Sequence, residues 1–593
     1  FTEVEEFFYG NKAAKGLIGD KELDGVTLML SDDNFGNLRS LPSEEMRKHK
    51  GGYGLYYHFD FHGGAHAYDW MNTNYLPKVW EQFTMAYEYG IRDIWMVNIG
   101  DICFLEYPLS YFFDLAYNMN EWGQINRTED YTKNWVKQQF TGFFNNKRLK
   151  EICEILEGYT RINHNRKPEV LNEKVYHPVH FNETKNLLEQ STAIIEKADK
   201  LFKLCPEEVK SSFYELIYYP AVASVNVLRM WLYAGRNEFY ARQNRVEANH
   251  LADKIAECIQ VDRELTEELH TINNGKWYGM GMSEHIGFTH WLEEGNRYPL
   301  MIRIEPANKP RIIVSKSDSD IYTEGYSWTG KTIIISDFLR PDMNEVVIDI
   351  ACGSKEPVKY SIESDCNWLT FSHTSGCVKV KDLLVIKRER NIQKGQQTAN
   401  VYINTINAKV HLRIEAEEVD LSQIPPMTFL ECNDSIVMEA DHFSYKQDVN
   451  KEGFQVIRNY GRTDCGIKSF PVLNDYTFKS EKPFVEYSFI AKSKGEYNLH
   501  LYLSSSNPPF MDHKLSVGIK VNHAIISIEN VVSKDFKSLD TGCRDWVKAV
   551  YENIRIYKTK VICKKGLNTL RIYAISPGVV MERIVLFPVD KKL

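Results

Sequence analysis

The sequence lacks the features that mark several large classes of protein. No run of about 18 apolar residues occurs in the 593 positions, so we expect no membrane span. The net charge of −8 comes without a long basic block, which argues against a nucleic-acid binder. The eleven cysteines are odd in number and form no CxxC pair, which argues against a zinc knuckle and a dense disulfide scaffold.

Common catalytic motifs are missing as well. No GxSxG, HExxH or Walker P-loop occurs, and GGYGLYYH (51–58) runs into a strand rather than a helix, unlike a dinucleotide-binding fingerprint. We therefore expect neither a metal nor a cofactor. The first ten residues have neither a basic n-region nor an apolar h-region, so we see no signal peptide in this chain.

Aromatic residues are plentiful instead, at 13% of the chain. Aromatic faces bury the C–H faces of sugars, but large β-sandwich cores show the same enrichment. The length predicts roughly three to five domains.

Residues 1–135 alternate strand-like and helix-like segments, which predicts βαβ units and a parallel sheet. The expected strands lie in 25–34, 53–61 and 92–101, and a helix is expected over 76–90. Three strands cannot close a barrel. We therefore expect the C-terminal part of a larger α/β domain, and a helix running into a loop over 1–19 fits a start in mid-domain. The chain is expected to be a fragment.

A helical period replaces this pattern over 136–305. A helix is expected to begin at Pro206, and Leu251, Ile255, Cys258 and Ile259 recur at spacings of three and four. This predicts a helical bundle that supports the catalytic domain.

The rest of the chain is expected to be all β. Val401 and Leu412 belong to alternating runs around a polar turn, which predicts a hairpin over 398–416. Pro425 and Pro426 suggest a linker between two β-sandwiches, at 306–424 and 425–593. The predicted fold class is thus a multidomain α/β, all-α and all-β protein.

Polar residues gather at the expected carboxyl ends of the three parallel strands, which is the edge where such folds build their sites. They are Asp32, Asp33, Asn34, His58, Asp60, Asn98 and Asp101. For the first three, an N-cap or Asx turn is the alternative, and for His58 a satisfied core imidazole. Burial of Asp60 against its aromatic neighbours would raise its pKa and keep it protonated as a general acid. Glycoside hydrolysis is the commonest chemistry of paired carboxylates.

The sequence resembles the α-glucuronidases of glycoside hydrolase family 115. The resemblance runs in collinear order through SDDNFGNLR (31–39), GGYGLYYHFDF (51–61), WMNTN (70–74), LPKVWEQ (76–82), IWMVNIGDICFLEYPLSYFFDLAYN (94–118), NRKPEVL (165–171), YYPAVASVNVL (218–228), ARQNRVEAN (241–249), GKWYGM (275–280), HIGFTHW (285–291) and SPGVVMERIVLF (576–587).

The resemblance implies a secreted or periplasmic, inverting enzyme that removes glucuronic acid or its 4-O-methyl ether from glucuronoxylan or a related glycan. It also implies an N-terminal α/β domain, a (β/α)8 barrel, a helical bundle and C-terminal β-domains. The N-terminal domain and the early barrel strands have no counterpart here. The region around Trp368 resembles small immunoglobulin-like modules of glycanases, and the last domain resembles carbohydrate-binding sandwiches.

An inverting mechanism places an acid and a base roughly 6.5–9.5 Å apart. We expect Asp32 or Asp33 as one partner and Asp60 or Glu106 as the other, because adjacent aspartates are too close to share the two roles. The residues expected to bind substrate are Asn34, Arg39, His58, Asn98, Asp101 and His285. Arg39 suits the substrate carboxylate, with a plain surface charge as the alternative.

Two departures from the family pattern concern Ala65-His66, where the family tends to have Pro-Arg, and the 283–288 segment. Two alternatives to a self-contained enzyme stay open. One is a non-catalytic polysaccharide-binding protein with a truncated barrel. The other is a site completed by a C-terminal segment, 504–512 or 542–553, of the same chain or of a second subunit in a homodimer, although Trp546 is more typical of a core residue.

Overall fold

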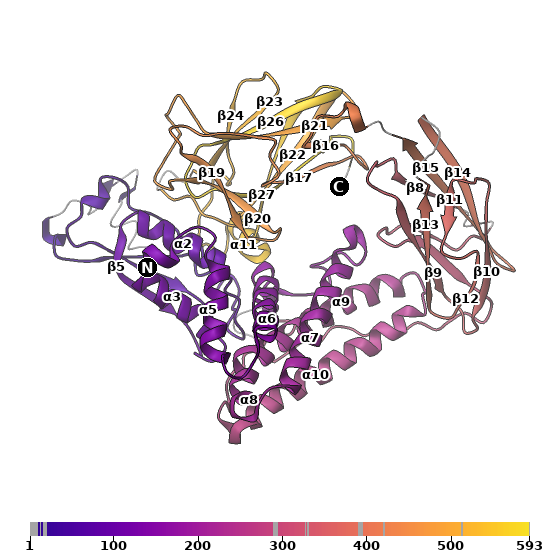
Figure 1. Cartoon of the computed structure of the whole chain (residues 1–593), viewed down its shortest axis with the longest axis horizontal. Coiled ribbons are helices and arrows are strands. Elements are labelled where there is room, and N and C mark those ends of the chain that lie inside the picture. Colours follow the sequence, from indigo (N-terminus) through magenta and orange to yellow (C-terminus); the bar gives the residue numbers. More distant parts are fainter. Residues whose placement is uncertain are drawn as a thin grey trace.

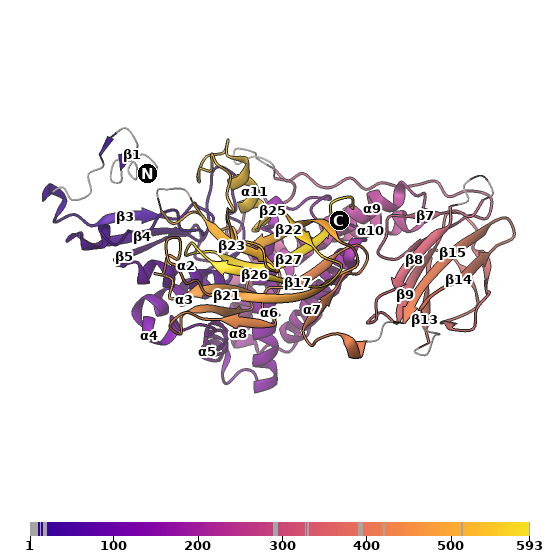
Figure 2. The same ribbon diagram turned by 90° about the horizontal axis from the view of Figure 1, so that it is seen from above.

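The computed structural model describes residues 10–11, 14–15, 21–288, 295–326, 328, 331–389, 395–418, 421–510 and 514–591. The chain doubles back on itself: the last β-rich part lies over the first α/β segment, and the middle β-rich part stands at the other end of the helices (Figures 1 and 2). The helix expected over the first residues falls largely on 1–9, outside the described residues. Two short antiparallel strands follow, β1 (Gly10–Asn11) and β2 (Ala14–Lys15).

The three predicted parallel strands are present and form one sheet in the order β3-β4-β5. They are β3 (Leu28–Ser31), β4 (Tyr53–His58) and β5 (Ile91–Asn98). Ser31 pairs with Tyr56 and His58 with Asn98, so the three carboxyl ends lie at one edge. On β5, Ile94 and Met96 are 44% and 51% exposed, as expected for a strand at an open edge. The (β/α)8 barrel stays a prediction.

Helices make up most of the chain between Leu76 and Gly275. They are α2 (Leu76–Glu88), α3 (Glu106–Tyr117), α4 (Met119–Trp122), α5 (Thr128–Phe140), α6 (Asn146–Asn165), α7 (Glu183–Lys203), α8 (Glu207–Phe213), α9 (Tyr219–Ala241) and α10 (Glu247–Gly275). A π-helical turn, Tyr214–Tyr218, joins α8 to α9. Helix α9 is buried on nearly every side because the other long helices surround it.

One hydrophobic core joins the sheet and the helices. Buried residues from Leu28 on β3 to Ile286 beyond α10 belong to a single cluster, which also takes in Tyr460 and Val580 of the last β-rich part. The α/β segment and the helices therefore pack as one body, and the C-terminal part adds side chains to the same core.

Two five-stranded sheets enclose a second core. Their strands are β6 (Ile312–Lys316), β7 (Tyr322–Thr323), β8 (Ile333–Phe338), β9 (Glu345–Cys352), β10 (Val358–Ser364), β11 (Leu369–Phe371), β12 (Ser375–Val378), β13 (Lys381–Arg388), β14 (Gly395–Asn404) and β15 (Lys409–Glu418). The predicted hairpin is confirmed, because β14 and β15 pair antiparallel with Val401 opposite Leu412.

Two six-stranded sheets form the C-terminal part. They contain β16 (Thr428–Leu430), β17 (Ile436–Glu439), β18 (Tyr445–Gln447), β19 (Gly453–Arg458), β20 (Cys465–Phe470), β21 (Phe484–Ala491), β22 (Gly495–Leu503), β23 (Ser516–Val521), β24 (Ser527–Asn530), β25 (Arg555–Cys563), β26 (Gly566–Ala574) and β27 (Val580–Pro588), and helix α11 (Arg544–Glu552) lies beside them. None of the described helices combines the length and apolarity that crossing a bilayer requires.

Candidate active site

The candidate site lies where the carboxyl ends of β3, β4 and β5 meet. Asp32 and Asp33 follow β3, Asp60 follows β4, and Asn98 ends β5. Since parallel strands end at the same edge, residues from three separate chain segments contact one another here.

Asp32 is fully buried and holds His58. His58 Nδ1 lies 2.6 Å from Asp32 Oδ1, and the His58 backbone N–H donates to Asp32 Oδ2 at 3.2 Å. The carboxylate also accepts from the backbone N–H groups of Asn34 and Gly36, at 3.2 and 3.0 Å. The first of these is the Asx turn that the sequence offered as an alternative. Burial raises the pKa of Asp32 above its usual range, against the opposing effect of His58.

Asp33 is a structural anchor. Its Oδ1 accepts from the backbone N–H groups of Phe35 and Asn37, both at 3.1 Å, and its Oδ2 accepts from Asn507 Nδ2 at 3.0 Å and from Trp546 Nε1 at 2.9 Å. Both oxygens are therefore saturated by protein donors. The structure thus separates the two neighbouring aspartates: Asp32 faces β4, and Asp33 binds the C-terminal part.

Asp60 is 8% exposed and is held by β5 and the turn after it. Asn98 Nδ2 donates to Asp60 Oδ1 at 3.2 Å, and the backbone N–H of Gly100 donates a short hydrogen bond to Oδ2. Burial raises the pKa of Asp60 to about 6, although the Gly100 N–H opposes this. This agrees with the direction expected from its aromatic neighbours. Asn98 also accepts from Tyr56 Oη at 3.3 Å.

Glu106, at the start of α3, faces a carboxylate that the sequence analysis did not identify. Glu215 comes from the π-helical turn, is buried, and accepts from the backbone N–H of Phe104 at 3.1 Å. Burial and the neighbouring Glu215 carboxylate raise the pKa of Glu106 well above its usual range. In the sequence, the one feature that pointed to Glu215 is that it is a glutamate on an otherwise apolar helical face.

The other predicted residues lie around this edge in different environments. Asn34 has a left-handed backbone (φ 64°), and its carbonyl accepts from Tyr68 Oη at 2.5 Å. Arg39 donates through Nε to Ser538 Oγ at 3.2 Å. Asp101 is exposed, and its Oδ2 accepts from the Gly281 N–H at 3.4 Å.

The His285 ring contacts protein groups through its face and through both of its nitrogens. Its ring stacks on Trp70 with centroids 3.7 Å apart, Nδ1 lies 2.8 Å from the Ser283 carbonyl, and Nε2 lies 3.1 Å from Asp262 Oδ1. Both ring nitrogens thus have protein partners, so the imidazole positions Trp70.

Lys167 and Tyr68 are further residues that the sequence analysis missed. Lys167 Nζ lies 3.8 Å from the centroid of the Tyr68 ring and donates to Thr73 Oγ1 at 2.8 Å. Burial lowers the pKa of Lys167, while Glu169 and the aspartates after β3 oppose the change. The motif NRKPEVL therefore brings a cation to the same edge, which its sequence context did not reveal.

The C-terminal part contacts residues that follow β3, through both of the segments 504–512 and 542–553; that either segment completes the site stays a prediction. Ser505 Oγ donates to Asn37 Oδ1 at 2.9 Å, in addition to the Asn507 and Trp546 contacts with Asp33. Trp546 is fully buried, as expected for a core residue. Positions 511–512 of the first segment lie outside the described residues.

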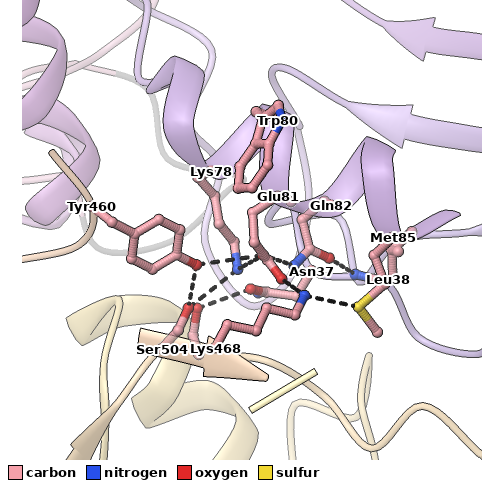
Figure 3. A network of polar contacts seen from close by, with 12 residues as sticks. Asn37, Leu38, Lys78, Trp80, Glu81, Gln82, Met85, Tyr460, Lys468 and Ser504 are labelled. Atoms are coloured by element: carbon pink, nitrogen blue, oxygen red, sulfur yellow. Dashed lines mark hydrogen bonds and ion pairs between the residues drawn. The ribbon is translucent and has the colours of Figure 1, made fainter. Parts of the chain in front are cut away.

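A buried polar network next to the site also joins the C-terminal part to the α/β segment (Figure 3). Glu81 of α2 pairs with Lys468 of β20 through a short contact and with Lys78 at 3.6 Å. Tyr460 Oη donates to Glu81 Oε2 at 3.4 Å and contacts Ser504 Oγ at 3.0 Å. Burial alone raises the pKa of Glu81, but Lys468 and Lys78 outweigh it and bring the pKa below its usual range.

Within the described residues, no three His, Cys, Asp or Glu side chains gather as ligands for a metal ion. The functional groups at the strand ends are carboxylates, imidazole, amides and cations, which suit acid–base chemistry on a hydroxylated substrate.

Comparisons with known proteins give two matches to family models. The model of glycosyl hydrolase family 115 matches residues 1–170, and that of the family 115 C-terminal domain matches residues 428–590. None of the curated proteins matches the chain.

One of the solved structures that are similar to this chain matches most of it. It is a family GH115 4-O-methyl-α-glucuronidase, BtGH115A, with specificity for decorated arabinogalactans; it is 18% identical, with a TM-score of 0.60, over 95% of this chain and 55% of its own. This chain thus spans about half the length of that structure.

A GH26-CBM35 β-(1,4)-mannanase from Podospora anserina is 12% identical over 27% of this chain and 29% of its own, with a TM-score of 0.19. A family 35 carbohydrate binding module from Clostridium thermocellum is 14% identical over 26% of this chain and 97% of its own, with a TM-score of 0.18. The last two scores lie below the range that indicates a shared overall fold.

Proposed function

Because this chain belongs to glycoside hydrolase family 115, we propose that the protein is a glycoside hydrolase that acts on glucuronylated glycans. It removes glucuronic acid or 4-O-methylglucuronic acid side chains by inversion. Glucuronoxylan and decorated arabinogalactan are the two substrate classes to compare, since the second is the one for which BtGH115A is specific. Secretion or a periplasmic location and assembly as a homodimer stay predictions.

Asp60 is proposed as the general acid. The observation that carries this assignment is the burial of its carboxyl at the strand ends, which raises its pKa to about 6. An acid near this value is protonated at mildly acidic pH and transfers its proton to the leaving sugar oxygen. Glu106 is the alternative acid, because a carboxyl that faces Glu215 retains a proton.

Asp32 is proposed as the partner on the base side, acting through His58. Its carboxylate orients the imidazole from Nδ1, which leaves Nε2 to accept a proton from the attacking water. Asn34, Arg39, Asn98 and Asp101 are proposed to contact the sugar and its carboxylate, and His285 to position Trp70. Asp33 is left with a structural role, because protein donors occupy both of its oxygens.

The pH dependence of uronic acid release tests the acid. We expect the intact protein to lose turnover as the pH rises above about 6, and Asp60→Asn to lower kcat about 10²- to 10⁴-fold. Asp93→Asn, on β5, is the control, because among the described residues the Asp93 carboxylate accepts from the Tyr53 backbone N–H, at 2.9 Å, and from no other donor. Full activity of Asp60→Asn would show that Asp60 is not the general acid and would leave Glu106 as the candidate.

A non-catalytic glycan-binding protein is the second candidate. The near-complete burial of His58, which is only 6% exposed, favours it, because the group that accepts a proton from the attacking water must reach that water. If the intact protein binds polysaccharide but releases no uronic acid from either substrate class, the binding protein is favoured over the enzyme.

A further inference from the structure

An exposed tryptophan is held against a tyrosine between β7 and β8. Trp328 is 80% exposed, and its ring stacks on that of Tyr326 with centroids 4.9 Å apart and only 8° between the ring planes. The Tyr326 hydroxyl lies 3.5 Å from the Pro310 carbonyl, to which Asn407 Nδ2 also donates at 2.8 Å. Because one face of the indole rests on Tyr326 and the side chain is still largely exposed, its other face is open to solvent.

Polar groups lie at the edge of this stack. Arg311 and Glu324 form a two-point ion pair, with Nε 2.9 Å from Oε2 and Nη2 2.5 Å from Oε1. Both charges act on the Tyr326 hydroxyl, since burial and Glu324 raise the pKa of Tyr326 and Arg311 opposes them. Asn407 is exposed beside Pro310. A flat aromatic face with amide and guanidinium donors at its edge suits a pyranose, which has C–H groups on its faces and hydroxyls around its rim.

Exposed lysines surround the stack. They are Lys309, Lys331 and Lys409. The first two lie close to Pro310 and Trp328 in the sequence, and the backbone N–H of Lys409 donates to the Gly325 carbonyl at 2.9 Å. Within the part of the chain that the structure describes, no Asp or Glu side chain pairs with these three lysines. Because the whole chain carries a net charge of −8, this local excess of positive charge favours an anionic ligand.

The stack stands apart from the candidate active site. Strands β7 and β8 lie at the end of the molecule opposite β3, β4 and β5 (Figures 1 and 2). A ligand bound at the stack is therefore not the sugar unit at the strand ends. A polymer suits both places, because one of its chain segments can lie on the stack while another lies at the strand ends.

We infer that the Tyr326–Trp328 stack is a second binding site for a uronate-bearing glycan, in which one pyranose ring packs on the open face of Trp328 and the surrounding lysines attract the uronate carboxylates. The choice of this glycan class rests on the proposed function as well as on the lysines. The binding itself requires no turnover, so it is tested separately from hydrolysis.

Binding of the intact protein to glucuronoxylan and to a glucuronylated arabinogalactan, measured by affinity electrophoresis, tests the inference. We expect at least one of the two glycans to bind, and Trp328→Ala to weaken that binding about fivefold to tenfold. Trp328→Tyr keeps an aromatic ring and should restore most of the affinity. Phe478→Ala is the matched control, because Phe478 is a 98% exposed aromatic residue in the C-terminal part.

The charge preference is tested with the carboxyl-reduced form of the bound glycan, in which each glucuronic acid is replaced by neutral glucose. The double variant Lys309→Gln, Lys331→Gln should weaken binding of the acidic glycan at low salt and leave binding of the reduced glycan unchanged. Equal effects on the two forms would show that the lysines do not select uronates and would overturn the anionic ligand.

Uronic acid release separates this inference from the proposed function. Trp328→Ala should release uronic acid from a short glucuronylated xylotriose at the rate of the parent, because the stack lies away from the strand ends. Binding that depends on Trp328, without any release by the parent, would refute the hydrolase and leave the inference standing. The inference is wrong if neither glycan binds, if Trp328→Ala binds like the parent, or if Phe478→Ala weakens binding as much.

Discussion

His58 Nδ1 lies 2.6 Å from Asp32 Oδ1, and both side chains are buried at the junction of β3 and β4. A buried carboxylate that accepts from an imidazole fixes both the orientation and the tautomer of the ring. The pair therefore holds the other ring nitrogen, Nε2, in one direction, as the proposed base requires.

Replacement of Asp32 by Asn should disable this base without changing the shape of the site. We expect kcat on a glucuronylated glycan to fall about 10²-fold or more and KM to change little, because the carboxylate acts through His58 rather than on the substrate. Asp24→Asn is the control, since Asp24 forms an exposed ion pair with Lys50. A rise in KM alone would assign Asp32 to substrate binding.

Asp60 should make the stability of the protein depend on pH. Its pKa is raised from 3.8 to about 6 by burial, so the folded state binds more protons than the unfolded state between these values. The stability that this carboxyl contributes is thus fully present below about pH 3.8 and is lost as the pH rises through about 6.

Asp60→Asn removes this dependence. Urea unfolding should show the variant to be more stable than the parent at about pH 8, with the difference shrinking towards about pH 4. A variant that is less stable than the parent at both pH values would show that the carboxylate, when ionised, stabilises the folded state.

The contact between Asp33 and the C-terminal part should be a large contribution to stability. Trp546→Phe removes the Nε1 donor from a buried carboxylate while keeping a ring in the core. We expect a loss of about 1.5–3 kcal/mol in the free energy of unfolding, measured by urea titration. Trp328→Phe, at an 80% exposed position, should leave stability within about 0.5 kcal/mol of the parent. Equal effects of the two substitutions would refute the anchoring role of Asp33.

The buried network of Figure 3 should couple the first and last parts of the chain. Lys468→Met leaves Glu81 with only Lys78 as a cationic partner, and we expect a loss of about 3 kcal/mol. Calorimetry should then resolve two transitions where the parent shows coupled unfolding of the two parts. Lys560→Met breaks an ion pair with Glu496 at the surface and should cost less than about 1 kcal/mol. An unsplit transition in Lys468→Met would show that other contacts hold the parts together.

Local patterns in the sequence were enough to predict several parts of this structure. The alternation of Val401 and Leu412 around a turn predicts a hairpin, because side chains of a half-buried strand repeat every two residues. The polar ends of β3, β4 and β5 were predicted to meet because parallel strands share an edge. Burial of Asp60 could be expected from the rings beside it.

Contacts between distant segments could not be predicted in this way. Trp546 and Asp33 are 513 positions apart, and only the docking of the C-terminal part brings them together. Glu215 appears in the sequence as one polar residue on an apolar helix, and nothing local indicates that it faces Glu106. Lys167 likewise reaches the site through the packing of its loop on Tyr68.

Time-resolved proton NMR of the uronic acid released from glucuronoxylan and from glucuronylated arabinogalactan tests the central claim most directly. An inverting enzyme that cleaves an α-linked uronic acid must release the β-anomer first, with the α-anomer following by mutarotation. We expect this order from the intact protein, and no release from Asp60→Asn within the same time. Initial release of the α-anomer, or no release of uronic acid from either glycan, would contradict the proposed function.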